Sequence, residues 1–270
     1  MKDARSWHVS LGVACVVSLA GCASPGPAAV PDLRPGLLQG YLPTEARVDS
    51  LALLPPPPAP GSVAMALDEE VARRAVALHA TPRWTQAILD ADLRFPGAAG
   101  TFSCAIGIPI TEASTPHLYQ LLRRSLTDAA FSTSSAKAHY KRTRPFVAGK
   151  TPICTPAEQA RLEEDGSYPS GHVTVGWVWA LVLAEVAPER AAAILARGLA
   201  FGESRNVCNL HWHSDVIQSQ VLGAGVAARL HAEPAFRADL EAARAEVAAL
   251  RAQGARPSRD CAAEAAALAR

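Results

Sequence analysis

The stretch Asp165-Gly-Ser-Tyr-Pro-Ser-Gly-His172, continued by VTVGWVWALVLAEVA to Ala187, decides the fold of this chain. Its first half is rich in turn-forming residues, and residues 172–187 are strongly apolar. The apolar run stops at Pro188, a residue that cannot continue a helix. We therefore predict a turn-rich loop that leads into an apolar helix beginning near His172.

Apolar residues recur at helical spacing on both sides of this stretch, while alternating runs typical of strands are scarce. The further helices are expected at residues 68–79, 83–93, 116–122, 129–144, 189–203, 211–231 and 234–253. This pattern predicts an all-α protein that consists of a single helical-bundle domain.

The composition is that of a globular protein. The 270 residues are enough for one domain with a sizeable core, and 49% hydrophobic against 19% charged residues excludes a disordered chain or a coiled coil. The formal charge of +1 falls to zero without residues 1–21, which contain Lys2, Asp3 and Arg5. A basic surface for nucleic acid is therefore not indicated.

The N-terminus resembles a bacterial lipoprotein signal. Lys2 and Arg5 precede a short apolar run from Leu11 to Ala20, which is too short to span a bilayer comfortably. The run ends in Leu19-Ala-Gly-Cys22, which predicts cleavage after residue 21, lipid on Cys22 and a periplasmic, membrane-anchored protein. The alternative is an ordinary signal peptide that is cut near Ala28.

The rest of the chain divides into three parts by composition. Residues 22–60 are rich in Pro and Ala and predict a tether, residues 61–253 the helical domain, and residues 254–270 a C-terminal tail. An apolar bundle of this size is compatible with a homodimer or a higher homo-oligomer.

Lys137 and Arg144 form the first candidate anion site. They are seven residues apart, so on a continuous helix both side chains project from one face and can reach one anion. Arg144 offers a planar fork for phosphate oxygens and Lys137 a point charge. The alternative is a solvated basic helix face that also includes Lys141 and Arg142.

Ser170 and Gly171 form the second candidate anion site, at the start of the apolar helix. Backbone N–H groups at a helix N-terminus, together with a hydroxyl and the helix dipole, attract an anion. The alternative is an ordinary N-cap serine followed by a glycine turn, but this leaves His172 at the mouth of an apolar helix unexplained.

His211 and Asp215 form the third block of candidate site residues. They are four residues apart, so on a helix they lie on one face. A carboxylate that accepts from Nδ1–H leaves Nε2 unprotonated, as a nucleophile needs. Arg205 adds a third cation. The alternatives are a surface His–Asp pair and, through His213, a His-x-His metal site, which we do not favour.

Together these blocks supply three cations, two histidines and one carboxylate. The set suits cations that hold a tetrahedral oxyanion while one imidazole attacks it and the other protonates its leaving group. We therefore predict phosphoryl transfer through a phosphohistidine, without a metal ion or another cofactor.

The same blocks match the signature of the type 2 phosphatidic-acid-phosphatase superfamily, which includes lipid phosphatases and vanadium haloperoxidases. The surrounding sequence, Gly202-Glu-Ser-Arg205 and His211-Trp-His-Ser-Asp215 among it, resembles the secreted class A bacterial acid phosphatases over roughly residues 50–250. The chain departs from the pattern of these phosphatases in three features: the lipidation motif Leu19-Ala-Gly-Cys22, His213 in place of a polar non-histidine residue, and the Cys104/Cys261 pair.

This resemblance implies a role for each site residue. His211 would be the nucleophile, His172 the general acid, and Asp215 the residue that orients His211. The phosphate ligands would be Lys137, Arg144, Ser170, Gly171 and Arg205. The implied activity is that of an acid phosphatase acting on a broad range of small phosphomonoesters.

Rival functions use the same pocket. A vanadate-dependent haloperoxidase would need bound vanadate, and lipid-phosphate phosphatases typically carry several membrane spans, of which this sequence shows none after the signal. An inactive anion-binding lipoprotein is the third rival, and the presence of both histidines argues against it.

Cys104, Cys154, Cys208 and Cys261 would remain besides Cys22 in the exported protein, an even number in an oxidising compartment. Cys154 lies between the first two blocks and Cys208 within the third. Because the blocks converge on one phosphate, we predict a Cys154–Cys208 disulfide and, by elimination, a Cys104–Cys261 disulfide. The alternative is four buried free thiols.

Overall fold

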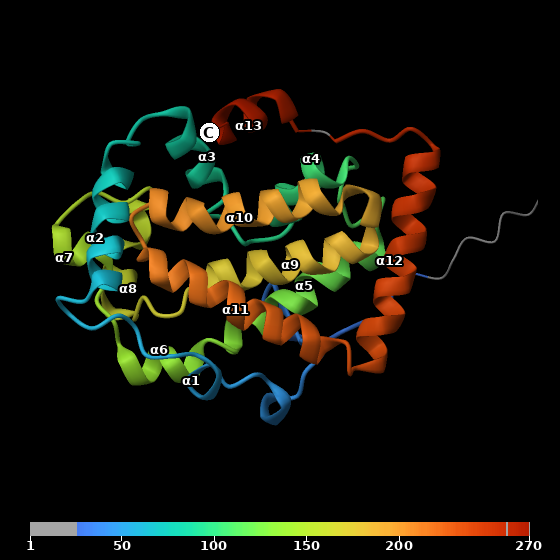
Figure 1. The fold of residues 1–270 in the computed structure, drawn as a ribbon. Coiled ribbons are helices and arrows are strands. Elements are labelled where there is room, and N and C mark those ends of the chain that lie inside the picture. The colour runs from blue at the N-terminus through green and yellow to red at the C-terminus, as the bar shows by residue number, and fades with distance from the viewer. Residues whose placement is uncertain (1–25, 258, 270) are drawn as a thin grey trace, which may run out of the picture.

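Helix α9 (Gly171–Val186) runs through the centre of the molecule (Figure 1). The computed structural model describes residues 26–257 and 259–269. Trp179 and Leu183 of α9 are fully buried. Because α9 is apolar on every side, it is stable only when other helices cover all of its faces.

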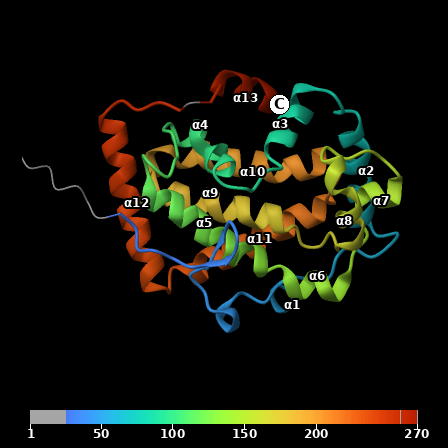
Figure 2. The ribbon, with the colours of Figure 1, turned by 180° about the vertical axis from the view of Figure 1, so that it is seen from behind.

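The other long helices provide this cover. α10 (Ala191–Val207) and α11 (His213–Leu230) run alongside α9, and α5 (Pro116–Phe131) packs against it from behind (Figures 1 and 2). α12 (Pro234–Ala252) crosses one end of this bundle and packs on α5. The predicted all-α fold is confirmed.

Shorter elements complete the part of the chain that the structure describes. The short helices are Ser50–Leu53 (α1), Val63–Val76 (α2), Pro82–Leu89 (α3), Ser103–Ile106 (α4), Ser134–Tyr140 (α6), Pro145–Gly149 (α7), Gln159–Glu164 (α8) and Cys261–Leu268 (α13). Turns of 3₁₀ helix lie at Thr44–Ala46, Gly97–Phe102, Pro156–Glu158 and Pro188–Arg190. Strands β1 (Asp32–Arg34) and β2 (Leu37–Leu38) form an antiparallel pair.

The helix predicted over residues 129–144 is wrong. The chain leaves α6 at Lys141, which adopts a left-handed conformation with φ of 43°, and Pro145 begins α7 instead of ending a helix. Lys137 and Arg144 therefore lie on different elements, and their spacing along one helix does not bring them together.

Much of the predicted 22–60 tether is part of the fold. Leu42 and Leu54 are buried, and the backbone N–H groups of Tyr41 and Leu42 donate to the buried carboxylate of Asp128 on α5 at 2.7 and 3.1 Å. This segment is therefore held by the bundle and is not a free linker. The predicted signal of residues 1–21 and the lipidation site at Cys22 lie outside the described residues.

Both predicted cysteine pairings are present as disulfides. Cys104–Cys261 fastens α13, within the predicted 254–270 tail, to α4, and Cys154–Cys208 joins the loop after α7 to the end of α10. α13 also packs on α3. Within residues 26–257 and 259–269, no helix has the length and hydrophobicity that crossing a membrane requires.

Candidate active site

A cavity of about 810 Å³ opens at the N-terminus of α9. The predicted site residues that line it are Lys137, Arg144, Gly171, His172, Arg205 and His211. The structure thus brings together residues from α6, α7, α9, α10 and the loop before α11. Two predicted site residues, Ser170 and Asp215, are fully buried behind the cavity wall.

Lys137 and Arg144 converge on the carboxylate of Asp165. Lys137 Nζ lies 3.0 Å and Arg144 Nη2 2.9 Å from Asp165 Oδ2. Burial, followed by the charge of Arg144, lowers the pKa of Lys137, while Asp165 raises it. In the sequence Asp165 is only a residue of the turn-rich loop, whereas in the structure it is the anion that pairs with both cations.

Backbone carbonyls fix the guanidinium of Arg144. Its Nε donates to the carbonyl oxygens of Leu162 and Asp165 at 2.9 Å each, and its Nη1 to that of Leu210 at 3.0 Å. The side chain is only 2% exposed. Arg144 is therefore held in place without a ligand and presents a fixed charge beside His211.

Arg205 retains an unused donor. Its Nη2 donates to the carbonyl oxygen of Ala87 at 2.8 Å and approaches Cys208 Sγ at 3.3 Å. Its Nε is buried and has no hydrogen-bond partner among the described residues. Because Arg205 lines the cavity and a buried unpaired donor is costly, an anion in the cavity is a suitable partner for this group.

Ser170 acts as the N-cap of α9. Its Oγ accepts from the backbone N–H of Val173 at 3.3 Å, which is the alternative left open by the sequence. Its own N–H donates to Ser219 Oγ at 2.7 Å. A hydroxyl can accept and donate at once, and among the described residues the Ser170 hydroxyl only accepts, so its proton is available to an anion. Gly171 follows at the cavity wall, where the positive end of the helix dipole lies.

His211 lies in the loop before α11, because that helix begins only at His213. The prediction that His211 and Asp215 share a helix face is therefore wrong. His211 Nδ1 lies 2.8 Å from the carbonyl oxygen of Ser167 and 3.6 Å from Asp215 Oδ2. A carbonyl can only accept, so Nδ1 carries the proton and Nε2 is the unprotonated nitrogen.

The other nitrogen of His211 faces a cation. Nε2 lies 3.1 Å from Arg144 Nη1, whose N–H donates to it. Burial and the charge of Arg144 lower the pKa of His211 to about 4, although Asp215 raises it in part. The two effects that lower the pKa therefore outweigh that of Asp215, and the imidazole stays neutral in mildly acidic solution.

His172 also lines the cavity, at the start of α9. Its Nε2 lies 2.6 Å from the carbonyl oxygen of Asp90, and its ring stacks on Phe201 with centroids 4.8 Å apart. Burial lowers its pKa well below the usual value, and Arg205 lowers it further, whereas the Asp90 carbonyl raises it. The two histidines are therefore held by different backbone carbonyls.

Arg142 does not belong to a solvated basic face, the alternative that the sequence left open, and no sequence motif indicates its role. Arg142 is almost buried and pairs with Asp68 of α2 at 2.7 Å and with Asp215 of α11 at 2.5 Å. Asp215 also accepts from the backbone N–H of Trp212 at 2.9 Å. The Asp68–Arg142–Asp215 triad therefore fixes the loop that carries His211.

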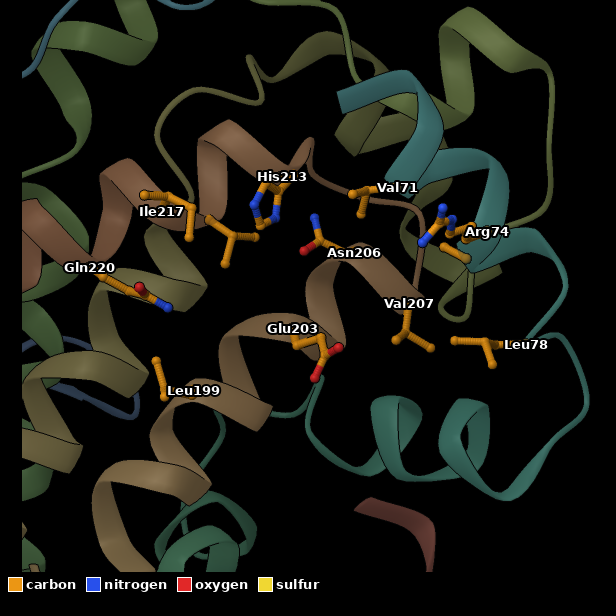
Figure 3. A pocket seen from close by; sticks show the side chains of 12 residues that line it. Val71, Arg74, Leu78, Leu199, Glu203, Asn206, Val207, His213, Ile217 and Gln220 are labelled. Carbon is orange, nitrogen blue, oxygen red and sulfur yellow. The ribbon is translucent and has the colours of Figure 1, made fainter. Parts of the chain in front are cut away.

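A second cavity, of about 400 Å³, lies between α2, α10 and α11 (Figure 3). His213, Glu203 and Asn206 point into it from one side and Val71 and Arg74 from the other. None of the predicted site residues lines it. Among the described residues, no group of three or more His, Cys, Asp or Glu side chains is placed to hold a metal ion.

Comparisons with known proteins identify the family of this chain. The sequence profile described as PAP2 superfamily matches residues 121–237. The chain is 43% identical to a non-specific acid phosphatase of Providencia stuartii, over 78% of this chain and 86% of that protein. It is 42% identical to an acid phosphatase of Zymomonas mobilis (74% and 75%) and 40% identical to a non-specific acid phosphatase of Salmonella typhimurium (78% and 84%).

The triad gives a prediction about stability. We expect Arg142→Leu to lower the free energy of unfolding at neutral pH by about 3–5 kcal/mol, because two buried carboxylates lose their shared cation. Burial raises the pKa of Asp215, but the hydrogen bond with His211 and the charge of Arg142 hold it below its usual value. The contribution of Arg142 therefore exists above that value and is lost as the pH falls. The defect should therefore shrink in acid when measured by denaturant unfolding.

Arg73→Leu is the matched control, since Arg73 pairs with Glu70 on the exposed face of α2. This change should alter the free energy of unfolding by less than about 1 kcal/mol. Equal effects of the two substitutions would contradict the structural role of the triad.

Proposed function

Because the chain belongs to the PAP2 superfamily and is an acid phosphatase, we propose that it hydrolyses phosphomonoesters through a covalent phosphohistidine on His211, without a metal ion. The observation that carries this proposal is the state of His211. Its Nδ1–H donates to the Ser167 carbonyl, and its unprotonated Nε2 lies at the cavity beside Arg144. This is the arrangement that an imidazole nucleophile requires.

The surrounding donors support attack on a phosphoryl group. Lys137, Arg144 and Arg205 place three cations around the cavity, and the N-terminus of α9 adds its dipole at Gly171. In phosphoryl transfer, charge spreads over the equatorial oxygens, and fixed cations stabilise it. A bound phosphate would take over the interactions that Lys137 and Arg144 make with Asp165.

His172 supplies the proton. In the first step the bond between His211 Nε2 and phosphorus forms, the bond to the leaving oxygen breaks, and His172 gives that oxygen its proton. In the second step neutral His172 takes a proton from the water that attacks phosphorus, the bond between phosphorus and His211 Nε2 breaks, and phosphate and free His211 are released. The cavity of about 810 Å³ is large compared with a phosphate group, which favours a broad range of small phosphomonoesters.

The phosphohistidine can be tested directly. We expect His211→Ala to lose turnover of para-nitrophenyl phosphate and to lose the acid-labile phosphoenzyme that rapid quenching of the wild type should trap. His172→Ala should still form the intermediate from a substrate with a good leaving group. Excess chelator should leave the rate unchanged. An active His211→Ala protein, or loss of activity with chelator, would contradict the proposal.

The pKa values give the pH dependence. His211 must be neutral, so activity should fall as the pH drops through its pKa of about 4. His172 must be protonated, and a bound phosphate dianion raises its pKa, so activity should also fall as this proton is lost. We expect a bell-shaped profile of kcat, which reports the enzyme–substrate complex, with its maximum below pH 7. A rate that climbs steadily into the alkaline range would exclude these roles.

For localisation we propose export and a lipid anchor on Cys22, as Leu19-Ala-Gly-Cys22 indicates. The two disulfides agree with an oxidising compartment. In cell fractionation the wild type should be found with membranes, and Cys22→Ser in the soluble fraction. Recovery of Cys22→Ser in the membrane fraction would count against the anchor.

A further inference from the structure

The geometry points to Asp90 as a positioning residue that holds His172 in the orientation needed to protonate the leaving group. This inference rests on the proposed function of His172 as general acid. Asp90 lies at the end of α3, in a segment that no sequence motif singled out, and it acts through both its backbone carbonyl and its side chain.

The backbone carbonyl fixes one edge of the His172 ring. The last carbonyl groups of a helix have no partner within that helix. Asp90 is the C-cap residue of α3, and its carbonyl oxygen lies 2.6 Å from His172 Nε2. Nε2 must therefore carry a proton, which leaves Nδ1, unpartnered among the described residues, as the nitrogen for the substrate in the cavity that His172 lines.

The side chain of Asp90 anchors this end of α3 to α10. The carboxylate is 1% exposed and pairs with the guanidinium of Arg197. It also accepts from Ser204 Oγ at 2.6 Å and from Gln86 Nε2 at 2.9 Å. Because these donors hold both carboxylate oxygens, the backbone carbonyl of the same residue has little freedom to turn away from His172.

α10 also supports the face of the His172 ring. Phe201 stacks on it with an interplanar angle of 14°. Phe201 can approach this closely because α9 has a glycine at position 176, where a Cβ would lie 2.1 Å from Phe201 Cδ1. α10 thus supplies both the stacking partner of His172 and the residues that anchor Asp90, so the His172 ring and the Asp90 carbonyl keep one relative position.

The anchor extends to the C-terminal helix. Arg197 Nε lies 3.3 Å from Glu264 of α13, and the Cys104–Cys261 disulfide fastens this helix. Arg197 is 3% exposed, so the two carboxylates neutralise a buried charge. The ion pair and the disulfide together hold α13 against α3.

The chemical consequence concerns one proton. In the first step His172 Nδ1–H passes its proton to the leaving oxygen as the bond from phosphorus to that oxygen breaks, and Nε2–H stays on the Asp90 carbonyl. The negative end of the α3 dipole favours the charged ring before transfer. A displaced Asp90 carbonyl would let the ring turn, and proton transfer would then suffer more than phosphate binding.

The test compares a good and a poor leaving group in Asp90→Asn. For butyl phosphate, whose alkoxide needs the proton, we expect kcat to fall at least about tenfold further than for para-nitrophenyl phosphate. KM for both substrates should stay within about threefold, since the phosphate ligands are untouched. The downfield Nε2–H resonance of His172, identified by its absence in His172→Ala, should shift or broaden.

Two further variants separate positioning from general loss of stability. Asp128→Asn removes another buried carboxylate, on α5, and should lower the melting temperature while leaving the ratio between the two substrates unchanged. Ser204→Ala deletes a single hydrogen bond to Asp90 and should show the same leaving-group effect in weaker form, even if Asp90→Asn fails to fold.

The outcomes distinguish this inference from the proposed function. If His172→Ala shows no preference for the good leaving group, the acid role itself is wrong. If His172→Ala shows it but neither Asp90→Asn nor Ser204→Ala does, His172 is the acid and Asp90 does not position it. In a His172→Ala background, Asp90→Asn should add no further leaving-group effect, and an additive effect would also overturn the inference.

Discussion

The neutralisation of buried charge is the constraint on which the arrangement of this site depends. A desolvated guanidinium is tolerated in a protein interior only when carboxylates or carbonyls compensate it. Arg142 lies between Asp68 and Asp215, Arg197 between Asp90 and Glu264, and Asp165 serves Lys137 and Arg144 together. Each pairing joins elements that are distant in sequence, so the charges that serve chemistry also fix the helices around the cavity.

The apolar helix α9 makes this arrangement possible. Because its faces are buried by α5, α10 and α11, its N-terminus is the place where polar groups can collect around one cavity. Ser170 caps the N-terminus of α9, Gly171 lies at the cavity wall, and His172 stacks on Phe201 of α10. A central hydrophobic element thus gives a rigid base to a strongly polar site.

The sequence was enough to predict the all-α fold, the residues that surround the cavity and the cysteine pairs, because side-chain type and order are local information. The sequence did not reveal which groups these site residues contact. Helical spacing failed for Lys137 and Arg144 because Lys141 takes a left-handed conformation, and for His211 because α11 starts two residues later. Arg142, Asp165 and Asp90 act through contacts across the fold, including backbone carbonyls, which have no signature in the residue type.

The cations around the cavity connect phosphate binding to activity at low pH. Cations placed to hold a phosphate also disfavour a proton on any imidazole beside them. Arg144 donates to His211 Nε2 and, with burial, lowers the pKa of that ring to about 4. The nucleophile that we propose, His211, must remain unprotonated at a pH where a free imidazole would be charged. The cationic pocket meets this requirement without a separate device, so in the proposed mechanism anion binding and a neutral nucleophile at low pH both follow from one charge distribution.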